Sequence, residues 1–135
     1  MMQPEDWNAL KYFKAHEFAC KCGECDSDGN EMDPHFMSML NQLRERFGFP
    51  LVITSGYRCP AYNERISTTG RDGPHTTGRA ADLHVVGKDA FRLVQQCGLG
   101  DWMLGIGIHQ RGPHQGRFIH LDDLTHDGRP WIWTY

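Results

Sequence analysis

The chain has 135 residues, of which 39% are hydrophobic and 23% are charged, as in an ordinary globular protein. A formal net charge of −3 gives no bulk attraction to nucleic acid, and no apolar run approaches the roughly 20 residues that span a membrane. Eight histidines are many for this length and hint at a metal. We therefore expect a monomeric, single domain over residues 1–135 that neither binds nucleic acid nor crosses a membrane.

Residues 1–19 mix aromatic and charged side chains, and we expect an N-terminal arm that packs on the core. Its first residues, Met1 to Asp6, lack the basic start and apolar stretch of a signal peptide. The sequence therefore predicts synthesis in the cytoplasm.

A cysteine-rich turn follows at residues 20–25, with Cys20, Cys22 and Cys25. These thiols could form half of a zinc site, with Cys59 as a fourth ligand. They could equally be free thiols in a reducing compartment, or disulfide partners. The second C-x-x-C pair of a complete zinc motif is missing, so these alternatives stay open.

The next elements form a helix and a buried strand. Asp33 and Pro34 have the N-cap and first-position chemistry of a helix, and Gly48 ends it. Apolar residues at helical spacing between them predict a core-facing stripe. The run 50–54 then predicts a buried strand, and it leads into Ser55-Gly56-Tyr57-Arg58.

The second half of the chain alternates between loops, one helix and short strands. We expect a short helix at 62–66, a loop at 67–74 that forms the rim of a cleft, and a helix at about 89–97 with Phe91, Val94 and Cys97 facing inward. Strands at 102–108 and 118–122 should pair as a hairpin, and the aromatic tail 129–135 should close the core or line the cleft.

Two of these strands alternate apolar and metal-binding side chains. Around Asp82, the residues Ala81 and Leu83 are apolar, so Asp82 points to the opposite face of its strand. His120 alternates with apolar neighbours in the same way. With His75, these residues would give zinc three ligands and leave one position open for water.

The motifs together resemble the zinc D-alanyl-D-alanine carboxypeptidase family. The run His-x-x-Gly-x-Ala-x-Asp occupies 75–82, with its His at 75 and its Asp at 82. The Ser-Gly-Tyr-Arg run at 55–58 precedes it, and Phe-Ile-His-x-Asp at 118–122 follows it. The family includes peptidases that cut peptidoglycan stem peptides, among them phage endolysins. The resemblance runs from about Phe13 to the C-terminus.

The resemblance implies zinc-dependent hydrolysis of peptide bonds in peptidoglycan stem peptides or cross-links. It places Arg58 near the metal, where it would bind or polarise the substrate, and it makes Ser55 and Tyr57 of the same motif substrate-binding candidates. Cytoplasmic synthesis then requires a route to the cell wall, such as host lysis, a holin or delivery in a virion.

The resemblance also exposes one departure, at the catalytic base. Classical members have an acidic residue three positions before the last His ligand, and here that position is Arg117. Asp122 could replace the base, or it could orient His120 through the other ring nitrogen. His84 could stabilise the oxyanion or be a hydrogen-bonded neighbour. We expect the other histidines, His109, His114 and His126, in loops.

The predicted fold is α+β, with a small antiparallel sheet that carries one catalytic zinc ion on one face and packs helices on the other. An enzyme is the first hypothesis. The alternative is a zinc-bearing binding or virion module that has lost turnover, which Arg117 favours.

Overall fold

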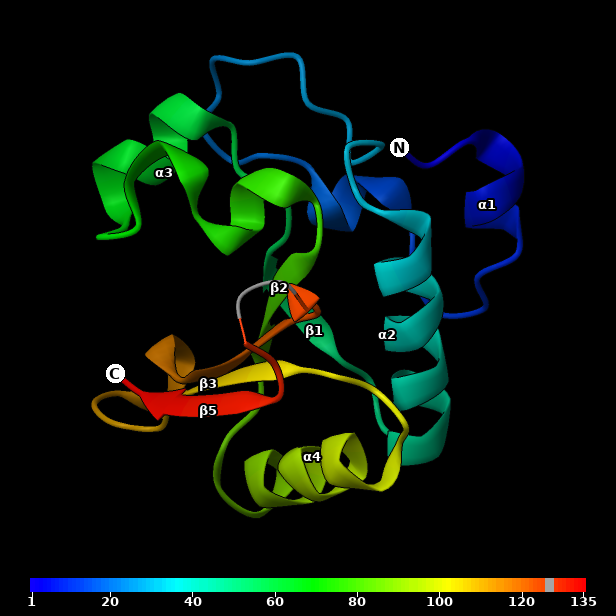
Figure 1. Cartoon of the computed structure of the whole chain (residues 1–135), viewed down its shortest axis with the longest axis vertical. Helices are drawn as coiled ribbons and strands as arrows, with labels where there is room; N and C mark the ends of the chain where they lie inside the picture. The colour runs from blue at the N-terminus through cyan, green and yellow to red at the C-terminus, as the bar shows by residue number, and fades with distance from the viewer. Residues whose placement is uncertain (126–127) are drawn as a thin grey trace.

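A computed structural model of the protein describes residues 1–125 and 128–135. In this part of the chain, helices surround a five-stranded sheet (Figure 1). The helices and 3₁₀ turns are α1 (Pro4–Asn8), η1 (Ala15–Phe18), α2 (Pro34–Phe47), α3 (Pro60–Ile66), η2 (Gly70–Asp72), η3 (Pro74–Thr77), α4 (Gly87–Leu99) and η4 (His114–Gly116). The strands are β1 (Val52–Ser55), β2 (Ala80–His84), β3 (Gly105–His109), β4 (Phe118–Asp122) and β5 (Trp131–Thr134).

The strand order is β1-β2-β4-β3-β5, and neighbours are antiparallel except for β3 and β5. The α+β prediction is confirmed, but the outermost strand makes the sheet mixed. Asp122, at the end of β4, and Trp131, at the start of β5, both pair with Gly105. Because β5 starts at the end of the sheet where β4 finishes, it runs antiparallel to β4 and therefore parallel to β3.

Helix α2 follows the predicted signals at both ends. The Asp33 side chain accepts a hydrogen bond from the backbone N–H of Phe36 at 2.9 Å, Pro34 is the first helical residue, and Gly48 takes a left-handed conformation with φ 82°. The apolar stripe is buried as predicted, at Phe36, Met39, Leu40, Leu43 and Phe47.

The core lies between α2, α4 and one face of the sheet, to which β2 contributes Ala81 and Leu83 and β4 contributes Ile119 and Leu121. The strand alternation was therefore predicted correctly.

Helix α4 covers this core with a set of residues that differs from the predicted one. Its buried residues are Ala90, Leu93 and Cys97. The inward placement of Phe91 was wrong, since its side chain is 66% exposed.

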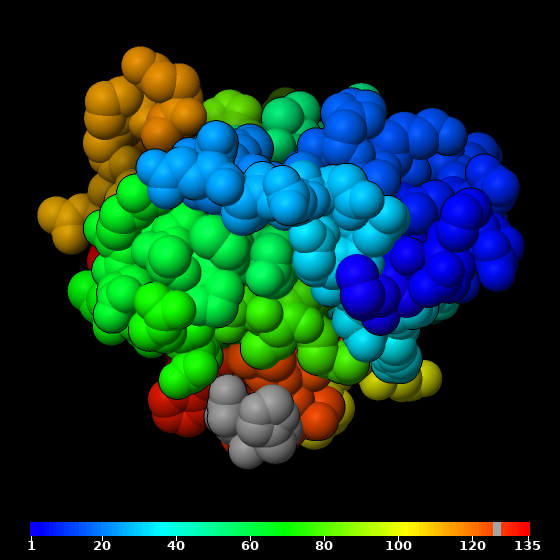
Figure 2. Space-filling model, turned by 90° about the horizontal axis from the view of Figure 1, so that it is seen from above, coloured from blue at the N-terminus to red at the C-terminus, as the bar shows by residue number. Residues whose placement is uncertain are grey.

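The N-terminal arm packs on this core, as expected. Its buried side chains include Trp7, Phe13 and Phe18, and the Phe18 ring lies 5.6 Å from the Phe13 ring. The Trp7 indole donates a hydrogen bond to the Asn30 side chain at 2.8 Å. Figure 2 shows the start of the chain, in dark blue, on one side of the molecule, with the light-blue segment that follows lying between it and the green segment that contains α3. Among the described residues, no helix has the length and apolar character needed to cross a membrane.

Candidate metal centre

Three side chains from three elements converge on one face of the sheet. Asp82 of β2 and His120 of β4 are direct partners in the antiparallel register. His75 comes from η3, and Gly78 then turns the chain into β2. All three side chains are buried, and each offers a ligand atom within 4.8 Å of the other two. The structure thus brings together the three predicted ligands.

The spacing of these atoms fits a small tetrahedral metal ion. The Asp82 Oδ1 atom lies 3.2 Å from His75 Nε2 and 2.9 Å from His120 Nδ1. Ligands bound to zinc at about 2.0–2.1 Å in tetrahedral geometry are about 3.3 Å apart, so little movement would be needed. Two imidazoles and a carboxylate are also a ligand set that zinc accepts.

The second nitrogen of each imidazole has its own partner. His75 Nδ1 lies 2.7 Å from the carbonyl oxygen of Gly56, and His120 Nε2 lies 3.0 Å from Asp122 Oδ2. Partners of this kind fix the tautomer and the ring orientation of metal-binding histidines. The rings are therefore held with His75 Nε2 and His120 Nδ1 directed at Asp82.

Burial and charge set the protonation of the three residues. Burial lowers the pKa of His75. Burial acts in the same direction on His120, but hydrogen bonds with Asp122 and Asp82 outweigh it and raise its pKa. Burial would raise the pKa of Asp82, but His75 and His120 outweigh it and the pKa is lowered. Asp82 is therefore an anion at neutral pH, and a metal ion would compete with a proton on His120.

Arg58 lies against the second oxygen of Asp82. Its Nη2 donates to Asp82 Oδ2 at 2.9 Å, Nε donates to Ser55 Oγ at 2.9 Å, and Nη1 donates to the Asn63 side chain at 3.2 Å. The backbone N–H of Arg58 donates to the carbonyl of His75 at 3.1 Å. This network fixes the guanidinium beside the three converging side chains.

Asp122 occupies a closed position behind His120. It is fully buried, and both of its oxygens accept hydrogen bonds from the Arg129 guanidinium. Burial would raise its pKa, but His120 and Arg129 outweigh it and lower the pKa. Asp122 therefore faces away from solvent as an anion, an arrangement that favours the orienting role over the role of base.

A cavity of about 560 Å³ opens over the three converging side chains. It includes Ser67, Thr68, Thr69 and Pro74 from the predicted rim, and Arg58 lies at its wall. The tail supplies Arg129, Trp131, Trp133 and Tyr135. The aromatic run of the tail predicted that it either closes the core or lines the cleft, and the sequence did not decide between the two. No sequence pattern singled out Arg129 or Asn63.

Strand β3 allows the tail to approach the site because it has glycines at 105 and 107. A Cβ on Gly105 would collide with Arg129 Nε and would lie 2.6 Å from Asp122 Oδ1. A Cβ on Gly107 would lie 2.8 Å from the Trp133 ring. The bare backbone of β3 therefore leaves the space that Arg129 and Trp133 occupy.

Besides Asp122, three further residues of the predicted peptidase site lie outside the lining of this cavity. Ser55 supports Arg58, and Tyr57 packs against the hydrophobic core. His84 lies two residues beyond Asp82, about 6.6 Å farther along the strand. There its Nδ1 is 2.9 Å from the carbonyl of Arg117, and it lines a separate hollow with Phe49.

His109 and His114 are likewise not among the residues that line the cavity. His109 ends β3 instead of lying in a loop, and its ring stacks on Phe118 at 5.0 Å. His114 lies in η4, and His126 is outside the described residues. The four cysteines considered as zinc ligands gather in a cluster of their own, made of Cys20, Cys22, Cys25 and Cys59.

Comparison with known proteins identifies the family. The family model described as Peptidase M15 matches residues 11–122. The chain belongs to the peptidase M15 family. No curated protein matches it. The match covers the three converging residues and Arg58 of this M15 peptidase, and it confirms the resemblance inferred from the motifs. It stops before the tail, so Arg129, Trp131, Trp133 and Tyr135 of the cavity lie beyond the matched range.

Proposed function

We propose that the protein is a zinc peptidase that hydrolyses peptide bonds in peptidoglycan stem peptides or cross-links. The observation that carries the proposal is the convergence of His75, Asp82 and His120 at the base of a cavity, in a chain of the peptidase M15 family. Zinc bound there would activate water and polarise the scissile carbonyl.

Other residues of the chain would bind the substrate and hold the metal ligands in place. Arg58 presents a fixed cation at the cavity wall, suited to a peptide carbonyl or carboxylate. Asp122 holds His120 in orientation through Nε2, and Arg129 holds Asp122. Phe118, Trp133 and Tyr135 give the cavity an aromatic wall, against which the apolar parts of a stem peptide would pack.

The test is digestion of purified peptidoglycan by the zinc-loaded protein, with fragments identified by mass spectrometry. We expect soluble peptide fragments from the wild type and none from His120→Ala. His114→Ala is the matched control, because His114 lies in η4 outside the cavity lining, and it should keep full activity. Equal digestion by His120→Ala would contradict the proposal. The fragment masses would identify the bond that is cut.

A second function, a zinc-bearing binding or virion module without turnover, is favoured by one observation. Among the described residues that line the cavity, Asp82 is the single one with an acidic side chain, and it is already directed at the histidines. Arg117, at the position of the family's base, donates to the carbonyl of Gly112 at 2.9 Å. Binding of zinc and peptidoglycan without any fragment release would favour this second function.

Delivery to the cell wall through host lysis, a holin or a virion stays a prediction from the sequence.

A further inference from the structure

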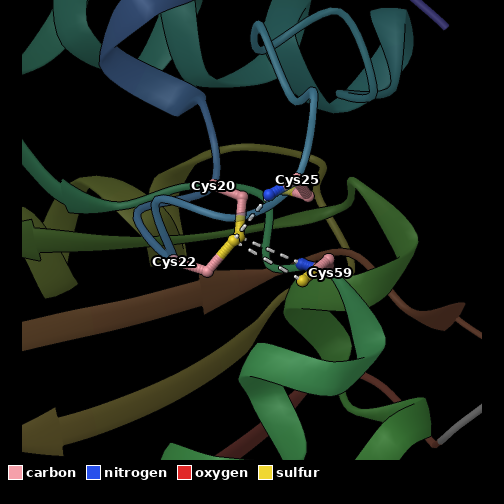
Figure 3. Close-up of side chains that lie close together, drawn as sticks. All are labelled: Cys20, Cys22, Cys25 and Cys59. Carbon is pink, nitrogen blue, oxygen red and sulfur yellow. Dashed lines mark hydrogen bonds between the residues drawn. The ribbon is translucent and has the colours of Figure 1, made fainter.

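A second group of metal-binding side chains lies apart from the cavity. Cys20, Cys22 and Cys25 of the turn after η1 meet Cys59, which directly precedes α3 (Figure 3). Each sulfur lies within 4.8 Å of the other three, and the sulfurs of Cys22 and Cys59 are 3.9 Å apart. All four are free thiols. The cluster therefore joins two segments that are 34 residues or more apart in the chain.

Backbone N–H groups point at two of these sulfurs. The Cys22 sulfur accepts hydrogen bonds from the N–H groups of Glu24 and Cys25, both at 3.3 Å. Gly23 makes this geometry possible, because its φ of 74° turns the chain back over Cys22. The Cys20 sulfur accepts from the N–H of Cys59 at 3.3 Å. Successive N–H groups of this kind stabilise an anion, here a thiolate.

We propose that Cys20, Cys22, Cys25 and Cys59 bind a structural zinc ion, distinct from the catalytic ion proposed at His75. Sulfurs bound to zinc at about 2.3 Å in tetrahedral geometry lie about 3.8 Å apart, close to the spacing of the cluster. A disulfide would join sulfurs in pairs at about 2.05 Å, and pairing does not require all four to converge. Four thiolates are a soft ligand set that favours zinc over the hard ions magnesium, calcium and manganese.

This ion would fasten the turn at 20–25 to the segment that carries Arg58. Cys59 follows Arg58 directly, and the backbone N–H of Tyr57 donates to the carbonyl of Phe18 at 2.9 Å. Figure 2 shows the light-blue turn region against the green α3 segment. The cluster therefore supports the cavity wall from outside, whether or not the cavity catalyses hydrolysis.

The first experiment counts zinc per chain by elemental analysis of protein purified under reducing conditions. We expect two zinc ions in the wild type, one in Cys22→Ser and one in His75→Ala. Cys97→Ser is the matched control, because Cys97 is buried in α4 outside the cluster, and it should keep two. A cysteine cluster without metal would give one ion in the wild type and none in His75→Ala, which would overturn this proposal and leave the proposed function intact.

The second experiment keeps the test valid if Cys22→Ser does not fold. Cobalt-substituted His75→Ala should show sulfur-to-cobalt charge-transfer absorption, since its remaining ion has thiolate ligands. Titrating wild type with an organic mercurial should release one zinc ion as the thiolates are modified. Absence of the charge-transfer band, or intact masses that reveal disulfides under reducing purification, would overturn the proposal.

Discussion

Arg129 donates two hydrogen bonds to Asp122, from Nε to Oδ1 at 2.7 Å and from Nη2 to Oδ2 at 2.9 Å. The backbone N–H of Leu124 adds a third at 3.3 Å, and His120 lies on Oδ2. A carboxylate with its lone pairs engaged in this way, and with no exposed surface, is poorly placed to take a proton from water in the cavity. Asp122 is therefore best described as a positioning residue.

Replacing Asp122 with Asn should weaken zinc binding while leaving the reacting groups in place. We expect zinc affinity at the His75 site to fall by about 10- to 100-fold, and excess zinc to restore most of the peptidase activity. Asp123→Asn is the control, since Asp123 is also buried and paired with an arginine, Arg79, but does not contact His120. A large loss of kcat at saturating zinc would instead assign Asp122 as the base.

The same carboxylate should make the metal-free protein sensitive to acid. Because the folded pKa of Asp122 lies below the ordinary 3.8, its stabilising contribution is present above pH 3.8 and is lost as the pH falls through the folded value. Urea unfolding from about pH 5 to about pH 3 should show a steeper loss of stability in the wild type than in Asp122→Asn. At neutral pH the variant should be less stable by about 3–5 kcal/mol, since Arg129 loses its buried partner. Parallel pH curves for the two proteins would contradict this account.

Arg58 should be irreplaceable by lysine, because it donates to three side chains at once. Arg58→Lys keeps the charge but cannot reach Asp82, Ser55 and Asn63 together. Losing one charge-assisted hydrogen bond, at about 1.5–3 kcal/mol, corresponds to a fall in kcat/KM of about 10- to 150-fold. Steady-state kinetics on a released stem peptide would measure it. Arg65→Lys, at an exposed ion pair on α3, should behave as wild type.

Gly105→Ala should damage the site from the strand behind it. The added Cβ would collide with Arg129 and crowd Asp122, and we expect a loss of stability of about 1–3 kcal/mol together with weaker zinc binding. Gly98→Ala is the matched control in helix α4, where a Cβ meets nothing within 4 Å. It should raise stability by about 0.5–1 kcal/mol. Thermal unfolding of both variants with and without zinc would check the pair.

The sequence predicted what depends on local pattern. Asp33 and Gly48 gave the ends of α2, and strand alternation separated Asp82 from its core-facing neighbours. The hairpin was also predicted, and in it Ile106 pairs with Leu121 and Ile108 pairs with Ile119. These features follow from side-chain period and capping chemistry, which a single sequence carries.

The rest depended on how segments meet in space. Alternation put His84 on the same strand face as Asp82, but it could not show that His84 bonds to the carbonyl of Arg117 and lines a different hollow. The partnership of Arg129 with Asp122 requires the chain to return beside β3, and no local pattern in the tail encodes that return. For the same reason, the sequence left open whether Cys59 joins the cysteines of the turn at 20–25, because no local pattern brings these two segments together.

The two glycines of β3 also carry an evolutionary consequence. Gly105 can gain a side chain only if Arg129 withdraws from Asp122, and Gly107 only if the Trp133 ring moves. We therefore expect residue 105 to co-vary with residue 129 among homologues, and residue 107 with residue 133, although the members of each pair are more than 20 residues apart in the sequence. Transferring this metal centre to another sheet would therefore require both strand β3 with its two glycines and the aromatic tail.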